Sequence, residues 1–177
     1  IEEDEDFGLS IESDGGNEEI VPTEAKKIFT SSGDLEIDSL HGNKTRGRLV
    51  LQPDFQRQYV WDSVKASKLI ESAILQIPLP IIYLSEEKDG REYVIDGQQR
   101  LTSFFSFVEG KFPDDKPFKL TGLNVCSDLN GKKFSELTDE IQDKIRYYKI
   151  RAITFQKDSS EELKFEIFER LNTGSVQ

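Results

Sequence analysis

The stretch that decides the fold reads Tyr93-Val94-Ile95-Asp96-Gly97-Gln98-Gln99-Arg100-Leu101. An apolar run typical of a strand turns at a glycine and opens directly into a run typical of a helix, which continues to Val108. The first N–H groups of a helix have no internal partners and carry the positive end of the helix dipole. A strand–glycine–helix turn therefore predicts an anion site, such as a phosphate site.

The side chains around this turn suit phosphate chemistry. Arg100 lies just inside the predicted helix, where a guanidinium can clamp a phosphate that the N–H groups of residues 97 to 99, beginning at Gly97, would cradle. Asp96 could bind Mg²⁺ or orient a water, and the adjacent amides of Gln98 and Gln99 could hold water, phosphate or a base. The structural alternative is that Asp96 caps the helix and Arg100 pairs with a surface carboxylate.

Apolar residues at helical spacing predict helices on both sides of the turn. Asp62 or Ser63 caps a helix that ends before Pro78. Gly110 ends the helix that follows the glycine turn, and the pair Ser159 and Glu162 forms a capping box for the last helix. The predicted helices span about 23–29, 63–77, 98–109, 138–148 and 159–174.

Short apolar runs predict strands, and Asp89-Gly90 is the turn signal of a hairpin that joins two of them. The run 35–40 fits either a strand or a helix, 41–47 is typical of a loop, and 111–134 is typical of loops and short strands. This mixture predicts an α+β fold in which helices pack on a small mixed sheet. The predicted strands span 48–51, 81–84, 92–95 and 149–155.

Charge is distributed unevenly along the 177 residues. Up to Glu24 there are ten acidic residues and no basic ones, whereas from Ala25 onward 23 basic residues face 24 acidic ones. We expect residues 1–22 to be an acidic, flexible leader, or alternatively a mimic of nucleic acid that blocks a basic groove, and 23–177 to be one domain truncated at its C-terminus. The near-neutral charge of residues 25–177 neither requires nor excludes nucleic-acid binding.

The single cysteine and single histidine exclude several classes of site. One cysteine cannot form an internal disulfide, and together with one histidine it cannot build the usual zinc site or a histidine-metal nuclease centre. No apolar run approaches the ~20 residues that span a bilayer, and no signal-peptide pattern opens the chain. We therefore expect a cytoplasmic protein that makes no membrane contact.

Two further polar stretches are candidates for the same site. Gln56 and Arg57 lie among the aromatic residues of 55–61, where either the aromatics are core and the polar pair faces solvent, or Arg57 reaches the anion held by the glycine turn. Near the end of the last helix, Arg170 precedes Asn172. Asn172 is either a C-cap residue or an amide that binds a metal-held phosphate or a base.

Four motifs occur in an order that marks a family: Pro53-Asp-Phe-Gln-Arg-Gln-Tyr-Val-Trp61, Leu69-Ile-Glu-Ser72 with Ile77-Pro-Leu-Pro80, Ile95-Asp-Gly-Gln-Gln-Arg-Leu-Thr102, and Phe168-Glu-Arg-Leu-Asn-Thr-Gly174. From about residue 30 to 177 the chain resembles the N-terminal domain of GmrSD-type modification-dependent restriction endonucleases, which is related to the ParB/sulfiredoxin-like fold. The resemblance implies a module that binds and hydrolyses an NTP and serves DNA restriction against phage.

The resemblance also implies residue roles and partners. Asp96, Gln98, Gln99 and Arg100 would form the nucleotide site around Gly97. The neighbouring Gln56 and Arg57, and more loosely Arg170 and Asn172 from the last helix, would complete it. Mg²⁺ would accompany the NTP, with Asp96 as a ligand. The partners would be modified DNA and a C-terminal or separate histidine-metal nuclease domain, with a homo-oligomer as a further option.

We therefore predict a Mg²⁺-dependent NTPase module in which Gln98 or Gln99 positions the attacking water and hydrolysis gates a nuclease. Three alternatives stay open. The chain could be a non-enzymatic, ParB-like DNA-binding module whose arginines and lysines grip phosphates, a metal-dependent nuclease that uses carboxylates alone, or an interaction scaffold. The nucleotide and the DNA modification are not specified by any residue pattern.

Overall fold

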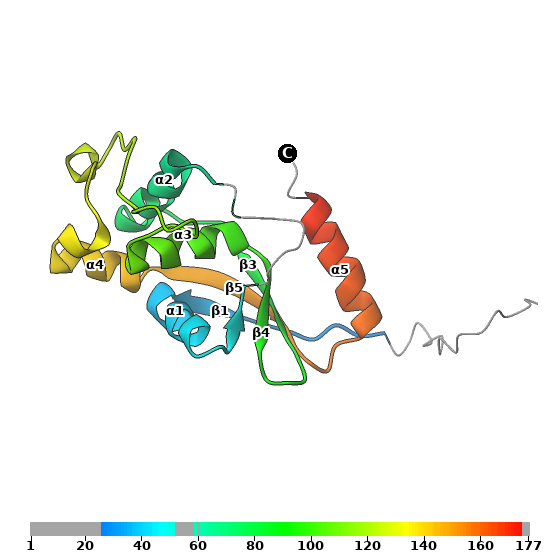
Figure 1. The fold of residues 1–177 in the computed structure, drawn as a ribbon. Helices are drawn as coiled ribbons and strands as arrows, with labels where there is room; N and C mark the ends of the chain where they lie inside the picture. The colour runs from blue at the N-terminus through cyan, green and yellow to red at the C-terminus, as the bar shows by residue number, and fades with distance from the viewer. Residues whose placement is uncertain (1–25, 52–58, 60, 175–177) are drawn as a thin grey trace, which may run out of the picture.

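The computed structural model of the chain describes residues 26–51, 59 and 61–174. A mixed sheet runs through it in the order β1-β5-β3-β4-β2 (Figure 1). β1 is antiparallel to β5, β5 is parallel to β3, β3 is antiparallel to β4, and β4 is parallel to β2. The strands are β1 (Thr30–Glu36), β2 (Leu49–Val50), β3 (Ile82–Glu86), β4 (Glu92–Asp96) and β5 (Lys149–Phe155).

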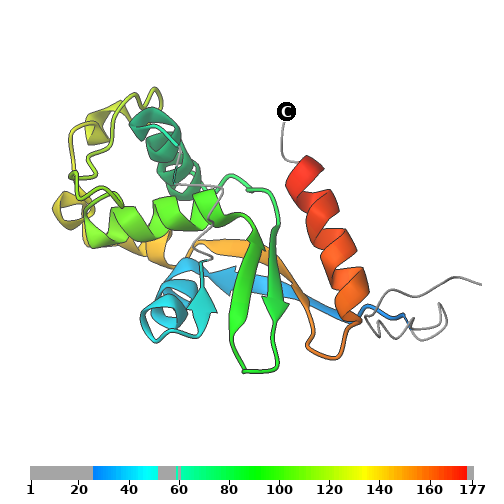
Figure 2. The same ribbon diagram turned by 45° about the vertical axis from the view of Figure 1, so that its right-hand side comes forward.

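Helices cover both faces of this sheet, so the predicted α+β fold is confirmed. The first four lie together on one face, and the last helix stands on the other side of the β3–β4 hairpin (Figures 1 and 2). None of the helices in the described ranges is both long enough and apolar enough to cross a bilayer. The helices are α1 (Ile37–Thr45), α2 (Ser63–Ile74), α3 (Gln98–Glu109), α4 (Asp139–Arg146) and α5 (Glu161–Gly174), with short 3-10 turns at Ser127–Leu129 and Phe134–Glu136.

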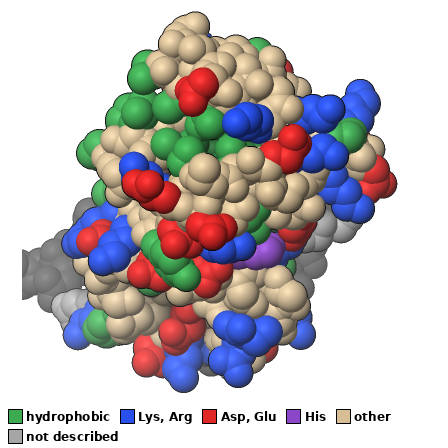
Figure 3. Space-filling model, turned by 90° about the vertical axis from the view of Figure 1, so that its left-hand side faces the viewer, with side chains coloured by type: hydrophobic (Ala, Val, Ile, Leu, Met, Phe, Trp, Pro, Cys, Tyr) green, Lys and Arg blue, Asp and Glu red, His purple; other side chains and the backbone are tan. Residues whose placement is uncertain are grey.

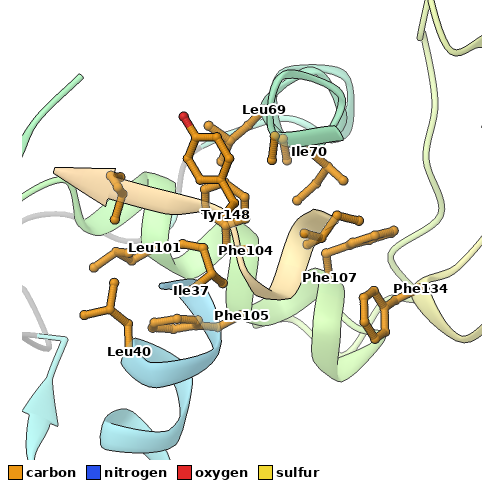
Figure 4. Close-up of a cluster of buried hydrophobic side chains, with 14 of the residues drawn as sticks. Ile37, Leu40, Leu69, Ile70, Leu101, Phe104, Phe105, Phe107, Phe134 and Tyr148 are labelled. Atoms are coloured by element: carbon orange, nitrogen blue, oxygen red, sulfur yellow. The ribbon is translucent and has the colours of Figure 1, made fainter. Parts of the chain in front are cut away.

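α3 is the central helix of the main core. Leu101, Phe104 and Phe105 are almost completely buried on it, between α1, α2 and the strand residues Leu84 and Val94. Figure 4 shows these side chains packed with those of the neighbouring helices. A helix held on so many sides has little freedom to move, because protein cores are close-packed. The N-terminal end of α3, which begins at the glycine turn, is therefore fixed in position.

A second, smaller apolar cluster lies under α5. The ring of Phe155 stacks with Tyr83 at a centroid distance of 6.2 Å and meets Phe168 of α5 edge-on at 5.7 Å. Lys164 of α5 is also buried, with 1% of its side chain exposed, and its ammonium lies 3.3 Å from the carbonyl oxygen of Glu86. α5 is therefore attached to the sheet by contacts separate from the main core.

Several predicted elements are confirmed to the residue. α3 spans 98–109, β5 spans 149–155, and Gly110 ends α3 in the left-handed conformation with φ 91°. Asp62 caps α2 by accepting a hydrogen bond from the Lys65 N–H at 2.7 Å. These features depend on apolar periodicity and on cap chemistry, which are local properties of a sequence.

Three local predictions were wrong. Residues 26–29 of the predicted helix 23–29 are not helical, because the backbone of Phe29 bonds to Ser159 and Gln156 beside β5. The predicted loop 41–47 is largely α1, which the buried Leu40 anchors to the core. Ser159 does not cap α5, since its hydroxyl bonds to Phe29. Instead the hydroxyl of Ser160 accepts from Leu163 N–H at 3.4 Å.

α1 and α3 are joined by charged groups at the surface. A carboxylate oxygen of Glu109 lies 2.9 Å from His41 Nε2 and 3.1 Å from Lys44 Nζ. Figure 3 shows the histidine on this face among acidic and basic side chains. Burial raises the pKa of Glu109, but the hydrogen bonds and charges of His41 and Lys44 lower it by more. The pKa of Glu109 is therefore below its ordinary value of 4.5.

We expect Glu109→Gln to lower stability at neutral pH by less than about 1 kcal/mol, because the contacts of Glu109 with His41 and Lys44 are partly exposed to solvent. A lowered carboxyl pKa stabilises the fold above the unfolded pKa, and this stabilisation is lost as the pH falls through the folded pKa. The difference in melting temperature between wild type and variant should therefore shrink at acid pH below 4.5. A difference that stays constant over this range would contradict the assignment.

Candidate functional site

The predicted anion site is the bend between β4 and α3. Gly97 occupies the N-cap position of α3 in the left-handed conformation, with φ 100°. The alternative in which Asp96 caps the helix is therefore wrong. A Cβ atom added to Gly97 would overlap Cγ2 of Ile82 and lie 3.2 Å from Nη2 of Arg100. Glycine is required here both by the backbone angle and by the close approach of Ile82.

A β-bulge precedes the bend. Leu84 of β3 pairs with Val94 of β4, but the preceding residue, Tyr83, pairs with Asp96. Between these two pairs β4 therefore contains one extra residue, Ile95. In an unbroken ladder Asp96 would follow Val94 on the same face of the sheet. The bulge instead places it opposite Tyr83, which stacks with Phe155 in the cluster under α5. The sequence gives no signal for this shift.

Arg100 lies against the bend, as predicted. Its Nη2 donates a hydrogen bond to the carbonyl oxygen of Ile81 at 3.0 Å, and a carboxylate oxygen of Asp96 stands 4.0 Å away. Its Nε–H is buried and has no hydrogen-bond partner in the described structure. Burial lowers the pKa of Arg100, and the charge of Asp96 raises it only partly back. The guanidinium is thus a partly desolvated cation with unused donor capacity.

The aromatic motif of residues 53–61 meets this helix through Tyr59. The Tyr59 and Ser103 hydroxyl oxygens are 2.9 Å apart, and Ser103 in turn donates to the carbonyl oxygen of Gln99 at 2.8 Å. Burial is the main cause that raises the pKa of Tyr59 above its ordinary value, and the bond to Ser103 opposes it. The two motifs are therefore neighbours in space. Gln56 and Arg57, the other predicted site residues of this motif, lie outside the described residues.

Ser103 was not among the predicted site residues. It is one of two buried serines on α3, the other being Ser106, and it lies four positions after Gln99. Its hydroxyl connects Tyr59 to the first turn of α3.

The two candidates from the last helix lie on α5. Arg170 donates to a carboxylate oxygen of Glu166 on its own helix at 3.1 and 3.2 Å. Asn172 lies within α5, which continues to Gly174, so it does not cap the helix. α5 packs against β4, and its C-terminal turns lie toward the same end of the sheet as the start of α3 (Figures 1 and 2). A role for either residue at the bend stays a prediction.

Metal-binding groups are sparse in the described part of the chain. No three His, Cys, Asp or Glu side chains there are grouped closely enough to hold a metal ion. Protein-bound Mg²⁺ in phosphoryl-transfer sites commonly takes one or two carboxylates and completes its shell with phosphate oxygens and water. Asp96 at the bend fits that sparse requirement, and it stays the predicted ligand.

Two cavities lie farther along α3 and adjoin each other at Phe112 and Pro113. The smaller, of about 290 Å³, includes Thr102, Ser106 and Glu109 of α3. The larger, of about 550 Å³, includes Tyr59 and Trp61 from the aromatic motif. The hydrogen-bonded path from Tyr59 through Ser103 to Gln99 links the larger cavity to the first turns of α3.

Comparison with known proteins returned one family. Residues 37–177 match the sequence model described as the GmrSD restriction endonuclease, N-terminal domain. No curated protein and no solved structure gave a significant match to the chain. The match covers every described element from α1 to α5.

Proposed function

Because the chain belongs to the GmrSD restriction endonuclease N-terminal domain family, we propose that it is the NTP-binding regulatory module of a modification-dependent DNA restriction system. Family membership gives the chain a part in a restriction system. In the proposed function a nucleoside triphosphate binds at the Gly97 bend, and its hydrolysis controls a nuclease domain or partner.

The state of Arg100 carries the proposal. A buried N–H donor normally has a hydrogen-bond partner, because an unpaired buried donor loses the hydrogen bond it made to water. Arg100 instead has one 3.0 Å bond to Ile81, a distant Asp96 carboxylate and a buried Nε–H without a partner. A polyphosphate beside Gly97 would supply the missing negative charge and acceptors at the positive end of α3.

Each residue of the bend has a separate role in the proposal. The N–H groups that begin at Gly97 cradle phosphate oxygens, and Arg100 holds the charge that develops on them. Asp96 would hold Mg²⁺, which neutralises phosphate charge when bound. The amide of Gln98 or Gln99 orients the attacking water. We expect Gln56, Arg57, Arg170 and Asn172 to complete the nucleotide site.

A thermal-shift panel of nucleoside triphosphates with Mg²⁺ tests the proposal. A ligand at one hundred times its dissociation constant stabilises a fold by about 2.7 kcal/mol. For a chain of this size we expect the melting temperature to rise by roughly 5–11 °C with the correct nucleotide. Steep salt-dependent DNA binding without any nucleotide effect would instead favour the non-enzymatic DNA-binding module.

We expect Arg100→Ala to weaken triphosphate binding by roughly 10- to 150-fold, since hydrogen bonds to charged groups contribute about 1.5–3 kcal/mol each. Arg91→Ala, which removes an exposed arginine just before β4, is the matched control and should bind as wild type does. Isothermal titration gives both affinities. The melting temperature without ligand shows whether Arg100→Ala is folded, because Arg100 also bonds to Ile81.

Retention of nucleotide affinity and turnover in a folded Arg100→Ala variant would exclude the bend as the phosphate site. Arg100→Lys separates charge from geometry, because lysine keeps the charge and loses the planar donor fork. We expect Arg100→Lys to bind nucleotide with an affinity between those of wild type and Arg100→Ala.

A further inference from the structure

The larger cavity beside α3 has the composition of a site for a planar ring. Tyr59, Trp61 and Phe112 bring aromatic side chains to a space of about 550 Å³, within the range of roughly 300–1,000 Å³ that small ligands occupy. The rings of Tyr59 and Phe112 are tilted to each other, with centroids 6.1 Å apart. Phe112 is in turn stacked on the buried Phe118 at 4.1 Å. The aromatic wall is thus supported from behind.

The charges around the cavity are balanced, which favours a neutral ligand group. Asp62 and Asp114 contribute carboxylates to the lining, and Lys116 lies 3.7 Å from the carboxylate of Asp114. The ammonium of Lys65 lies 4.5 Å from the centroid of the Trp61 ring. Two acidic and two basic groups attract neither an anion nor a cation strongly. A carboxylate accepts several hydrogen bonds, so these groups suit a heterocycle with N–H donors on its edge.

The cavity is also connected to the bend. The Tyr59 hydroxyl contacts Ser103, and Ser103 donates to the carbonyl oxygen of Gln99. Ser103 lies four residues after Gln99, which is about 6 Å along the helix axis. A nucleotide that uses both places would have its sugar between a ring at the aromatic wall and phosphates at the start of α3.

We propose that the cavity lined by Tyr59, Trp61 and Phe112 binds the nucleobase of the nucleotide. This proposal rests on the proposed function, because it takes the phosphates to lie at the Gly97 bend. Stacking on aromatic side chains tolerates every base, since each has a π-face. The carboxylates of Asp62 and Asp114 accept hydrogen bonds from N–H groups at the edge of the base and thereby select among bases.

Trp61 provides a direct readout, because it is the single tryptophan of the chain and lines the cavity. The experiment follows its fluorescence, excited beyond the absorption of the bases, during titration with adenosine, guanosine, uridine, their triphosphates and inorganic tripolyphosphate. We expect a saturable change with at least one nucleoside and its triphosphate, and none with tripolyphosphate. A thermal-shift series with tripolyphosphate and Mg²⁺ measures the phosphate site independently.

Three variants define the site. Tyr59→Ala should weaken nucleoside and nucleotide affinity by roughly 5- to 150-fold, the range for loss of one base–aromatic stack. Tyr59→Phe should retain most of the affinity, because it keeps the ring. Asp114→Ala, at an exposed position, should weaken binding several-fold. Tyr147→Ala removes an exposed tyrosine that does not line the cavity and should bind as wild type does.

The outcomes separate this proposal from the proposed function. Stabilisation by tripolyphosphate without any Trp61 response to nucleosides or triphosphates would overturn the base site and leave the phosphate site intact. A nucleoside response without stabilisation by tripolyphosphate would support the base site and count against the bend. A response to triphosphates alone supports the base site if Tyr59→Ala weakens it. Equal affinities for Tyr59→Ala, Asp114→Ala and Tyr147→Ala would overturn the base site.

Discussion

Gly97→Ala should destabilise the protein by about 3 kcal/mol and abolish nucleotide binding. A non-glycine residue in the left-handed conformation costs about 1–2 kcal/mol, and overpacking a filled site adds about 1–3 kcal/mol. Both apply, because Gly97 has φ 100° and a Cβ there would overlap Ile82. The melting temperature should fall by roughly 6–12 °C.

Gly90→Ala is the matched control for this substitution. Gly90 also has a positive φ, 83°, but a Cβ there meets no atom within 4 Å. It should therefore show the backbone cost alone, about 1–2 kcal/mol, and leave nucleotide binding unchanged. Urea denaturation of both variants gives the difference. Equal losses of stability in the two variants would show that Ile82 does not close on the bend.

Lys164→Glu should destabilise the protein by about 3–5 kcal/mol, the range for an uncompensated buried charge. The Lys164 ammonium lies 3.9 Å from a carboxylate oxygen of Glu87 and 3.7 Å from one of Glu161. A glutamate in its place would put a third negative charge into a position that is 1% exposed. Because Lys164 joins α5 to the end of β3, the expected result is release of α5 from the sheet.

Lys164→Met is the control for this position. Methionine fills a similar volume without charge, and Glu87 and Glu161 stay solvated because 33% and 65% of their side chains are exposed. We expect its stability to lie within about 1.5 kcal/mol of wild type. Urea denaturation gives the stabilities, and limited proteolysis reports whether α5 is released. Similar results for the two variants would mean that the charge environment of Lys164 does not hold α5.

Position 164 also bears on the proposed function, because α5 carries Arg170 and Asn172. If these residues contact the nucleotide, Lys164→Glu should weaken nucleotide binding while Lys164→Met does not. Unchanged affinity in a variant with a released α5 would remove both residues from the site.

Much of the local structure around the site could be read from the sequence. The α3 boundaries and the glycine bend follow from apolar spacing and from the conformational freedom of glycine, which involve residues a few positions apart. The position of Arg100 beside the bend follows from the same short stretch. The family could also be predicted, because its motifs are contiguous runs of residues.

Contacts between residues that are far apart in the sequence could not be predicted from local patterns. The bond from Arg100 to the Ile81 carbonyl joins residues 19 positions apart, and the Tyr59–Ser103 contact joins residues 44 apart. The extension of α1 past Leu40 depends on the core that it packs against. The burial of Lys164 depends on α5 docking on the far face of the sheet.

The sequence by itself determined that a strand turns at Gly97 into a helix with an arginine in its first turn, because backbone preference and apolar periodicity act over short distances. Tertiary structure decided what surrounds that turn. Ile82 lies against the glycine, Arg100 meets the carbonyl of Ile81 and a distant carboxylate of Asp96, and Tyr59 of the aromatic cavity reaches α3 through Ser103. The physical reason is that desolvation and hydrogen-bond pairing depend on which distant segments fold together, and no local pattern records that choice.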